Sequence, residues 1–291
     1  MLLRCSHKKL PELLLYFSTA GCWILVSALA WRAGRRPALA AAAAPPPGAP
    51  RADVHPETFL VPVGLVLHAL LLYERVVTTD GLDLGVANAI SLLVWLTLLI
   101  YWLGGLAYPS LSAMLGLMAP LGVLALLLQA ALPTHHYVNY RGEALFALHF
   151  GVAMLAYSLF IVATVHALVM LAEERWLHRG VLPPFIGSLP PLLEMEALLF
   201  RILLAAFTLL TLTLVTGVFF SEQVFGKPFK ANHKTIFAFV SWLIFGGLLA
   251  GHYFRGWRGK KAVRWTLAGF VALLLAYIGS KVVLEIILQR A

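Results

Sequence analysis

The chain reads ALFALHFGVAMLAYSLFIVATVHALVMLA from residue 144 to residue 172, without a single Asp, Glu, Lys or Arg. A helix of about 20 apolar residues crosses the hydrocarbon core of a lipid bilayer. These 29 residues are therefore long enough to cross a membrane and to project beyond it into the charged run Glu173-Glu174-Arg175. The stretch predicts a membrane-spanning helix.

Most of the chain is equally apolar. Hydrophobic residues make up 61% of the 291 residues and charged residues only 12%, whereas a typical soluble domain has about 25% charged residues. The mean hydropathy of +0.87 excludes a water-soluble globule, because a globule of this size has too little interior to hide so many apolar side chains. We therefore predict an all-α, polytopic membrane helical bundle with about eight transmembrane helices, at roughly 12–31, 57–74, 86–105, 110–132, 144–172, 198–220, 234–254 and 263–287.

The first 56 residues differ from the rest. Their apolar run continues past Cys22 to Trp31 and ends at Arg32, so we interpret it as a retained first span and not as a cleaved signal sequence. Residues 33–56 are rich in Ala and Pro and are predicted to form a disordered linker. The expected organisation is a first transmembrane helix with its linker at 1–56, followed by a membrane domain at 57–291.

The net charge of +9 does not indicate nucleic-acid binding, because the basic residues gather at the ends of apolar runs, as the positive-inside bias produces. With Lys281 left out, the loops and ends on the side of the N-terminus carry nine Lys and Arg, and the other side carries twelve. This difference predicts both termini on the outer side of the membrane. The cluster from Arg255 to Arg264 is the strongest cytoplasmic anchor.

Few strongly polar side chains fall at membrane depth, where they are costly and usually face a protein interior or a cofactor. Most are histidines within predicted spans, with one more at the mouth of the seventh: His68, His149, His166, His252 and His233. Neutral imidazole is the commonest metal ligand and a usual axial ligand of haem iron. Small residues near His149 and His252 would let a flat porphyrin approach, or equally a neighbouring helix. For each histidine alone, packing is the competing interpretation.

Two charged residues of the last span, Lys281 and Glu285, are spaced i, i+4 and can pair with each other. They could also act in a proton relay, which suits a proton-coupled small-molecule permease with discontinuous helices. Pro120 is a candidate break in the fourth span. A structural membrane scaffold, with every polar group satisfied by packing, is a further alternative. No enzyme is predicted, because we find no acid/base pair, nucleophile elbow or phosphate loop.

The C-terminal third carries a series of distinctive motifs. They are Pro190 to Glu196 (PPLLEME), Leu209 to Gly217 (LLTLTLVTG), His233-Lys234-Thr235, Ser241 to Phe245 (SWLIF), Gly251-His252-Tyr253, Gly256 to Lys261 (GWRGKK) and Ala276 to Lys281. Upstream, Leu148-His149-Phe150, Ala156-Tyr157-Ser158 and His68 fit the same pattern. Together these motifs resemble the cytochrome c assembly protein family, in its CcsA-like/HemX-like branch. The resemblance covers spans two to eight, and the GWRGKK stretch with its surroundings is its most specific part.

The resemblance implies a bacterial inner-membrane protein of cytochrome c biogenesis that binds or handles haem, with periplasmic termini. Its partners would be haem and apocytochrome c or other cytochrome assembly proteins. In the larger relatives, histidines within spans hold one haem, while histidines at the outer face present haem for attachment. By position, His149 resembles an outer-face ligand and His252 an intramembrane ligand of haem iron, with axial ligation by two neutral histidines. His68 and His233 are further cofactor-binding candidates.

One departure from the larger relatives concerns the segment before the seventh span. There the larger proteins have a Trp-rich outer segment ending in Trp-Asp, whereas this chain has Gly226 to Asn232 (GKPFKAN), with no Trp and no Asp. No histidine follows the last span to pair with His149. We therefore expect an accessory protein that binds haem, or stabilises or regulates an assembly complex, without performing the attachment itself.

Overall fold

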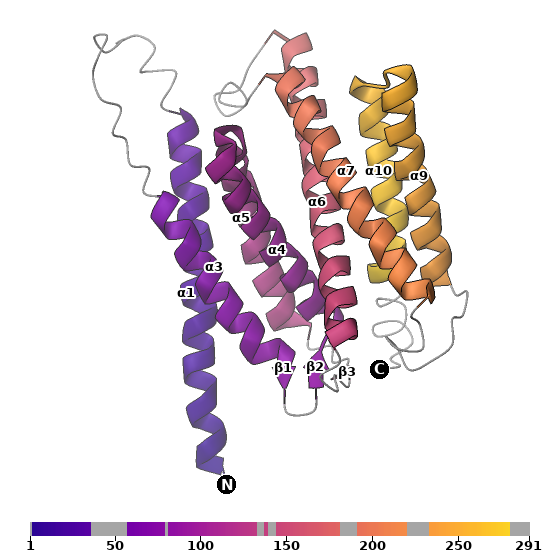
Figure 1. Cartoon of the computed structure of the whole chain (residues 1–291). Coiled ribbons are helices and arrows are strands. Elements are labelled where there is room, and N and C mark those ends of the chain that lie inside the picture. Colours follow the sequence, from indigo (N-terminus) through magenta and orange to yellow (C-terminus); the bar gives the residue numbers. More distant parts are fainter. Residues whose placement is uncertain are drawn as a thin grey trace. The chain divides into compact units, whose positions relative to one another are not determined.

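The computed structural model describes residues 2–35, 57–78, 81–132, 137–138, 144–180, 191–219 and 233–279. In these ranges most residues belong to eight α-helices (Figure 1): α1 Leu2–Arg35, α3 Glu57–Val76, α4 Val86–Ala107, α5 Pro109–Ala131, α6 Ala144–His178, α7 Leu192–Phe219, α9 His233–Arg255 and α10 Gly259–Leu274. A π-helix, η2 (Leu275–Gly279), continues from α10. The predicted all-α architecture is confirmed.

Seven of the described helices, α1 to α9, are long and apolar enough to cross a bilayer. The eighth predicted span begins within α10, which has 16 residues, and continues into η2. Its part beyond residue 279, with Lys281 and Glu285, lies outside the described residues. The predicted linker lies outside them from residue 36 to residue 56. The seven helices confirm a polytopic membrane protein.

The start of the sixth span was predicted too late. We expected a loop and a short amphipathic segment over 173–197, but α7 already begins at Leu192. Pro191 precedes it, and Glu194 lies in its first turn, where a carboxylate is favoured near the free N–H groups of the helix. The helix therefore includes Glu196, which the sequence had placed in a connection.

Three short β-strands were not predicted. They are β1 Val77–Thr78, β2 Gly81–Asp83 and β3 Tyr137–Val138. β2 and β3 pair antiparallel, with Asp83 opposite Tyr137, and the Asp83 carboxylate accepts a hydrogen bond from the Gly85 N–H at 3.2 Å. Strands of two or three residues are too short for a hydrophobic alternation, so the sequence pattern does not reveal them.

The chain divides into two compact units. Unit 1 consists of Met1–Val77, Ile90–Pro133 and Gly180–Pro190, and unit 2 of Thr78–Ala89, Thr134–Arg179 and Pro191–Ala291. Unit 1 therefore holds α1, α3, α5 and most of α4, and unit 2 holds α6, α7, α9 and α10. The domain limit predicted at residue 56 stays a prediction.

In unit 1, α1 packs on α3 and α5. Trp23 of α1 is fully buried, and a Cβ atom added at Gly122 of α5 would lie 3.0 Å from its indole ring. Further along the same pair of helices, a Cβ at Gly116 would collide with the methyl group of Ala30. Close approach through small residues is a common packing device of membrane helices, and here it holds α1 against α5.

We predict that Gly116→Ala lowers the stability of the detergent-solubilised protein by about 1–3 kcal/mol, because the added methyl group overpacks the contact with Ala30. Thermal unfolding followed by size-exclusion chromatography measures the effect. Adding Ala30→Gly should restore most of the loss. Gly21→Ala is the matched control, since a Cβ at Gly21 meets no atom within 4 Å. Equal effects of Gly116→Ala and Gly21→Ala would contradict the packing.

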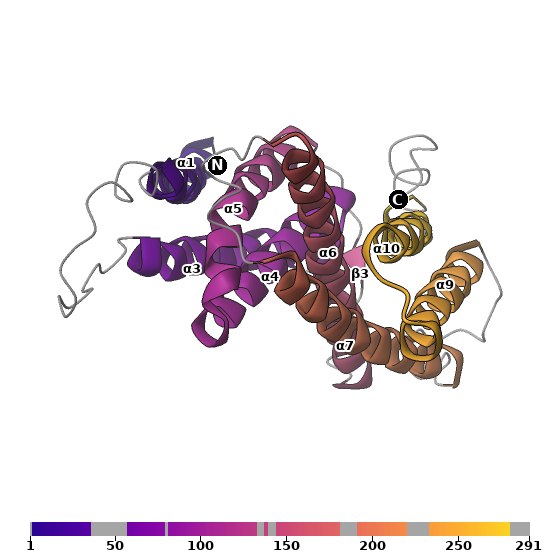
Figure 2. The ribbon, with the colours of Figure 1, turned by 90° about the horizontal axis from the view of Figure 1, so that it is seen from above.

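Unit 2 is a bundle of long helices. α7 packs against α6 and α9, and α10 lies against both α6 and α9 (Figures 1 and 2). In its interior the ring of Phe160 on α6 stacks on that of Phe245 on α9, with centroids 4.0 Å apart and planes inclined by 21°. Ser241 of α9 donates a hydrogen bond to the Gly269 carbonyl of α10 at 2.9 Å. These contacts fix the helix ends that carry the candidate site.

Candidate functional site

The turn between α9 and α10 folds back onto the end of α9. Gly256 has a φ of 63°, in the left-handed region that suits glycine, and the reversed chain brings the Trp257 N–H to the Gly251 carbonyl at 3.2 Å. The Trp257 ring lies directly against Gly251, where any Cβ would collide with it. The Lys261 ammonium lies 3.7 Å from the centroid of the same ring, within cation–π range. The GWRGKK motif thus forms a packed turn that closes α9.

This turn also orients His252. Its ring Nδ1 lies 3.0 Å from the carbonyl oxygen of Trp257. A carbonyl oxygen only accepts hydrogen bonds, so Nδ1 carries the proton and donates it. The neutral imidazole then has its lone pair on Nε2, for which the described part of the chain provides no hydrogen-bond partner. An Nδ1–H held by a backbone carbonyl is the usual support of a metal-ligating histidine.

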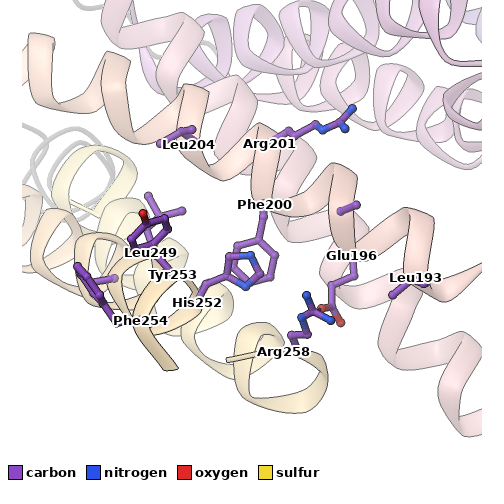
Figure 3. Close-up of a pocket in the computed structure, with 12 residues that line it drawn as sticks. Leu193, Glu196, Phe200, Arg201, Leu204, Leu249, His252, Tyr253, Phe254 and Arg258 are labelled. Atoms are coloured by element: carbon purple, nitrogen blue, oxygen red, sulfur yellow. The ribbon is translucent and has the colours of Figure 1, made fainter. Parts of the chain in front are cut away.

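The imidazole of His252 is further fixed by Phe200 of α7. The two rings are nearly parallel, with centroids 3.5 Å apart and planes inclined by 15° (Figure 3). Phe200 itself is buried. The orientation of His252 is therefore set from two directions, by the backbone of the turn and by the ring on the neighbouring helix.

A pocket of about 640 Å³ opens beside His252, between the first turns of α7 and the last turns of α9 (Figure 3). This volume falls within the range of small-molecule sites, about 300–1,000 Å³. Much of the wall is apolar or aromatic, including Leu204, Leu249 and Phe254. The pocket thus combines a flat apolar surface with a histidine nitrogen that is available to a ligand.

Charged side chains line one side of the pocket: Glu196, Arg201 and Arg258. The Glu196 carboxylate lies 3.5 Å from the Arg258 guanidinium and accepts a hydrogen bond from the Gly259 N–H at 3.1 Å. The guanidinium of Arg201 points away from His252 (Figure 3). Two positive groups and one negative group leave the pocket with a net positive charge, which favours an anionic ligand.

His149 and His233 lie at the other end of unit 2. The His149 Nδ1 is 2.8 Å from the Thr216 hydroxyl near the end of α7. That hydroxyl donates to the Leu212 carbonyl at 2.8 Å, so it accepts a hydrogen bond from the His149 Nδ1–H. His233 is the exposed first residue of α9, and its neighbour Lys234 interacts electrostatically with His149.

The distance between the two ends excludes one iron held by both His149 and His252. Their partners Thr216 and Phe200 are 16 residues apart on α7, which is about 24 Å at 1.5 Å per residue. A metal–imidazole bond is about 2 Å long. The two histidines therefore belong to separate sites, and their roles as an outer-face ligand (His149) and an intramembrane ligand (His252) of haem iron stay predictions.

His68 belongs to unit 1 and has different surroundings. Its ring is fully buried, its Nε2 lies 2.9 Å from the Ser91 hydroxyl, and Ser91 donates to the Gln129 side chain at 3.4 Å. The Trp23 ring packs edge-on beside it, with centroids 6.4 Å apart. These side chains join four helices, as expected of a packing residue, and the role of His68 as a cofactor contact stays a prediction.

No group of three or more His, Cys, Asp or Glu that could hold a metal ion occurs in the part of the chain that the structure describes. The segment Gly226 to Asn232, which replaces the Trp-rich loop of the larger relatives, lies outside that part. Any metal bound at the pocket would therefore need to bring its other ligands with it, as the iron of a porphyrin does.

A family model described as Cytochrome C assembly protein matches residues 58–288. The chain belongs to the cytochrome c assembly protein family. Inner membrane protein YpjD of Escherichia coli (strain K12) is 29% identical over 233 residues, which cover 77% of this chain and 85% of that protein. Cytochrome c biogenesis protein CcsA of Prochlorococcus marinus (strain MIT 9515) is 34% identical over 86 residues, 30% of this chain and 28% of that protein. No solved structure matches the chain significantly.

Membership of the cytochrome c assembly family supports a role in cytochrome c biogenesis and confirms the resemblance drawn from the motifs. The family match begins after α1. The residues around His252 come from different segments: Glu196 and Phe200 from near the start of α7, and Trp257 and Arg258 from the turn after α9.

Sequence reasoning identified His252 but missed the partners on α7. Glu196 was not predicted as a site residue, because the span was expected to begin only at residue 198. Phe200 and Arg201 fell within the predicted span, but no local pattern marked them as site residues. A usable signal was present in Pro191 followed by the acidic Glu194, since proline just before a helix and a carboxylate in its first turn are typical of a helix start.

We predict that Gly251→Ala lowers the stability of the solubilised protein by about 1–3 kcal/mol, because the added methyl group displaces the Trp257 ring. Thermal unfolding measures the change. In a Trp257→Ala background the same substitution should cost much less, since the contact is shared. Gly151→Ala serves as control, because a Cβ there meets nothing within 4 Å. A loss for Gly251→Ala that Trp257→Ala leaves unchanged would contradict this packing.

Proposed function

We propose that this member of the cytochrome c assembly family binds haem in the pocket beside His252 and handles it in cytochrome c biogenesis. One observation carries the proposal: His252, whose Nδ1–H is donated to the Trp257 carbonyl, lines a cavity of about 640 Å³. Haem would supply an iron that takes one imidazole nitrogen as axial ligand. The apolar wall suits its macrocycle, and the two arginines suit its propionates.

The protein is proposed to be accessory and not to attach haem itself. The basis is the GKPFKAN segment, which lacks the Trp and Asp of the larger relatives. His149 and His233, at the opposite end of unit 2, are proposed to contribute to a separate outer-face site. There the protein would meet apocytochrome c or another assembly protein. No catalytic residue is proposed.

We place the protein in the bacterial inner membrane with both termini in the periplasm. The nine-to-twelve distribution of Lys and Arg supports this orientation. The pocket would then lie toward the cytoplasm, because the basic turn with Arg255, Arg258 and Lys260 follows the last residues of α9. A haem that enters from the cytoplasm would meet His252 first.

The permease alternative lacks its expected break. α5 runs unbroken from Pro109 to Ala131 with Pro120 inside it, so the predicted interruption of the fourth span is wrong. The hydrogen bonds of His68 and Ser91 favour packing at that position, although the buried Nδ1 of His68 has no hydrogen-bond partner among the described residues. They do not account for a histidine that lines a cavity, which is why we prefer haem handling.

We predict that the protein purified in detergent binds added haem with a His-type Soret band, and that His252→Ala shifts or abolishes this band because the iron loses its axial nitrogen. Absorption titrations with haem measure the effect. His178→Ala is the matched control, since His178 is exposed and its described partner is Glu174 at 3.7 Å. A wild-type protein without a Soret shift, or one in which His252→Ala behaves as wild type, would refute the proposal.

A complementation experiment in cells distinguishes haem handling from a purely structural role. In a strain that lacks the chromosomal gene, the wild-type chain should restore cytochrome c, and His252→Ala should restore clearly less at equal membrane abundance. Haem staining of membrane and periplasmic fractions measures the cytochromes. Full restoration by both His149→Ala and His252→Ala would instead support the scaffold.

We also predict that His149→Ala leaves the His252-dependent band unchanged. Their partners on α7, Thr216 and Phe200, lie about 24 Å apart along that helix, so the effects of the two substitutions should be additive. Titrations of the two single variants and the double variant provide the measurement. A band that requires both histidines would show that they act on one haem, against the geometry.

A further inference from the structure

The pocket beside His252 already holds a carboxylate, that of the chain's own Glu196. Its two oxygens are used separately: Oε1 lies 3.5 Å from the Arg258 Nε, and Oε2 accepts the Gly259 N–H at 3.1 Å. Figure 3 shows Glu196 and Arg258 facing each other next to the His252 and Phe200 rings. The cationic corner of the pocket is therefore taken by a group that is chemically the same as the acidic group of a carboxylated ligand.

The two members of this pair differ in exposure. The Glu196 side chain is 14% exposed, whereas the Arg258 side chain is 65% exposed. Arg258 can thus turn toward a ligand without leaving solvent, and Glu196 is held between α7 and the turn. Because the guanidinium is largely in solvent, the ion pair contributes only about 1 kcal/mol. A ligand carboxylate with a planar, well-anchored body can therefore compete for the guanidinium, because its own contacts with the pocket add to the ion pair.

The charges lining the pocket favour such an exchange. Arg201 and Arg258 outnumber Glu196, and Arg201 has no ion-pair partner among the described residues. A ligand carboxylate would pair with Arg258, and Arg201 adds further positive charge to the lining of the pocket. With such a ligand bound, the Glu196 carboxylate would lose its place at Arg258. Its negative charge would then repel the carboxylates of the ligand and weaken the retention of that ligand.

We propose that Arg258 forms a carboxylate subsite of this pocket and that Glu196 is a resident competitor for it. Glu196 occupies Arg258 before a carboxylated ligand enters, gives way when the ligand binds, and returns to Arg258 when the ligand leaves. The inference rests on the proposed function, since it assigns the propionate side of the same haem pocket. A protein that hands its ligand on needs a site that also lets go, and a built-in competitor provides release without a change of fold.

The simpler alternative is that Glu196 only ties α7 to the turn between α9 and α10. In that case the loss of its charge would loosen the pocket for every ligand alike. Under competition, the same change would strengthen the binding of carboxylated ligands alone. The two cases therefore predict opposite signs for the same variant.

The experiment titrates three ligands into the full-length protein in detergent: haem, haem dimethyl ester and metal-free protoporphyrin IX. The ester lacks free carboxylates but keeps the iron, and protoporphyrin IX lacks the iron but keeps the carboxylates. Each variant is compared with wild type for the same ligand, so differences in ligand solubility cancel. Absorption reports the two haems, and fluorescence quenching reports protoporphyrin IX.

We expect Glu196→Gln to bind haem and protoporphyrin IX about 3- to 10-fold more tightly than wild type, with slower dissociation, and the ester equally well. Arg258→Gln should weaken the binding of haem and of protoporphyrin IX by a similar factor and leave the binding of the ester unchanged. Glu194→Gln removes the same charge two residues earlier on the exposed side of α7 and should change nothing. Arg258→Gln also covers the case in which Glu196→Gln does not fold, because the Arg258 side chain is largely in solvent.

Several outcomes would overturn the inference. Glu196→Gln could weaken the binding of all three ligands and lower the melting temperature. That result would show that Glu196 only ties α7 to the turn between α9 and α10. Arg258→Gln could bind haem as tightly as wild type does, which would show that Arg258 forms no carboxylate subsite. If either occurs while the Soret band still depends on His252, the proposed function stands without this inference. If protoporphyrin IX responds to both variants but the band does not depend on His252, the inference stands and the iron ligation fails. If none of the ligands binds, both fail.

Discussion

A polar group in hydrocarbon costs several kcal/mol unless it has a hydrogen-bond partner, and the helices of this chain are arranged under that constraint. Many hydroxyl side chains satisfy it locally, by donating to the carbonyl four residues earlier, as Thr97, Ser158 and Thr266 do. Such bonds say nothing about the neighbouring helix. The polar side chains that reach another helix or a turn are fewer, and they determine which segments meet.

The histidines show how one residue type meets the same constraint in different ways. His68 joins a network of side chains inside unit 1, His149 donates to a hydroxyl that is itself bonded to its own helix, and His252 donates to a backbone carbonyl of the turn. Of these three, His252 is the one that also lines the described pocket. The possible chemistry therefore depends on the partner of Nδ1 and on the space beside Nε2, and not on the presence of an imidazole at membrane depth.

The spans were predictable because hydropathy is a sum over consecutive residues, and the long run that ends at Ala172 needs no knowledge of its neighbours. The start of α7 was predicted six residues too late, because the charges of Glu194 and Glu196 outweighed the helix-start signal of Pro191. His252 could be singled out from its depth and its motif. Phe200 could not, since nothing local distinguishes it from the other apolar residues of α7; its contact with His252 depends on how α7 crosses α9.

By itself the sequence determined that lipid is part of the solvent, that the chain crosses it repeatedly as helices, and which family its motifs belong to. Each of these depends on the composition or order of neighbouring residues. Only the tertiary structure decided that His149 and His252 lie at opposite ends of unit 2, that the proton of His252 is on Nδ1, and that Glu196 occupies Arg258 beside the pocket. These depend on distances between residues that lie up to 67 positions apart in the chain, and hydrogen bonds and ion pairs form only within a few ångströms.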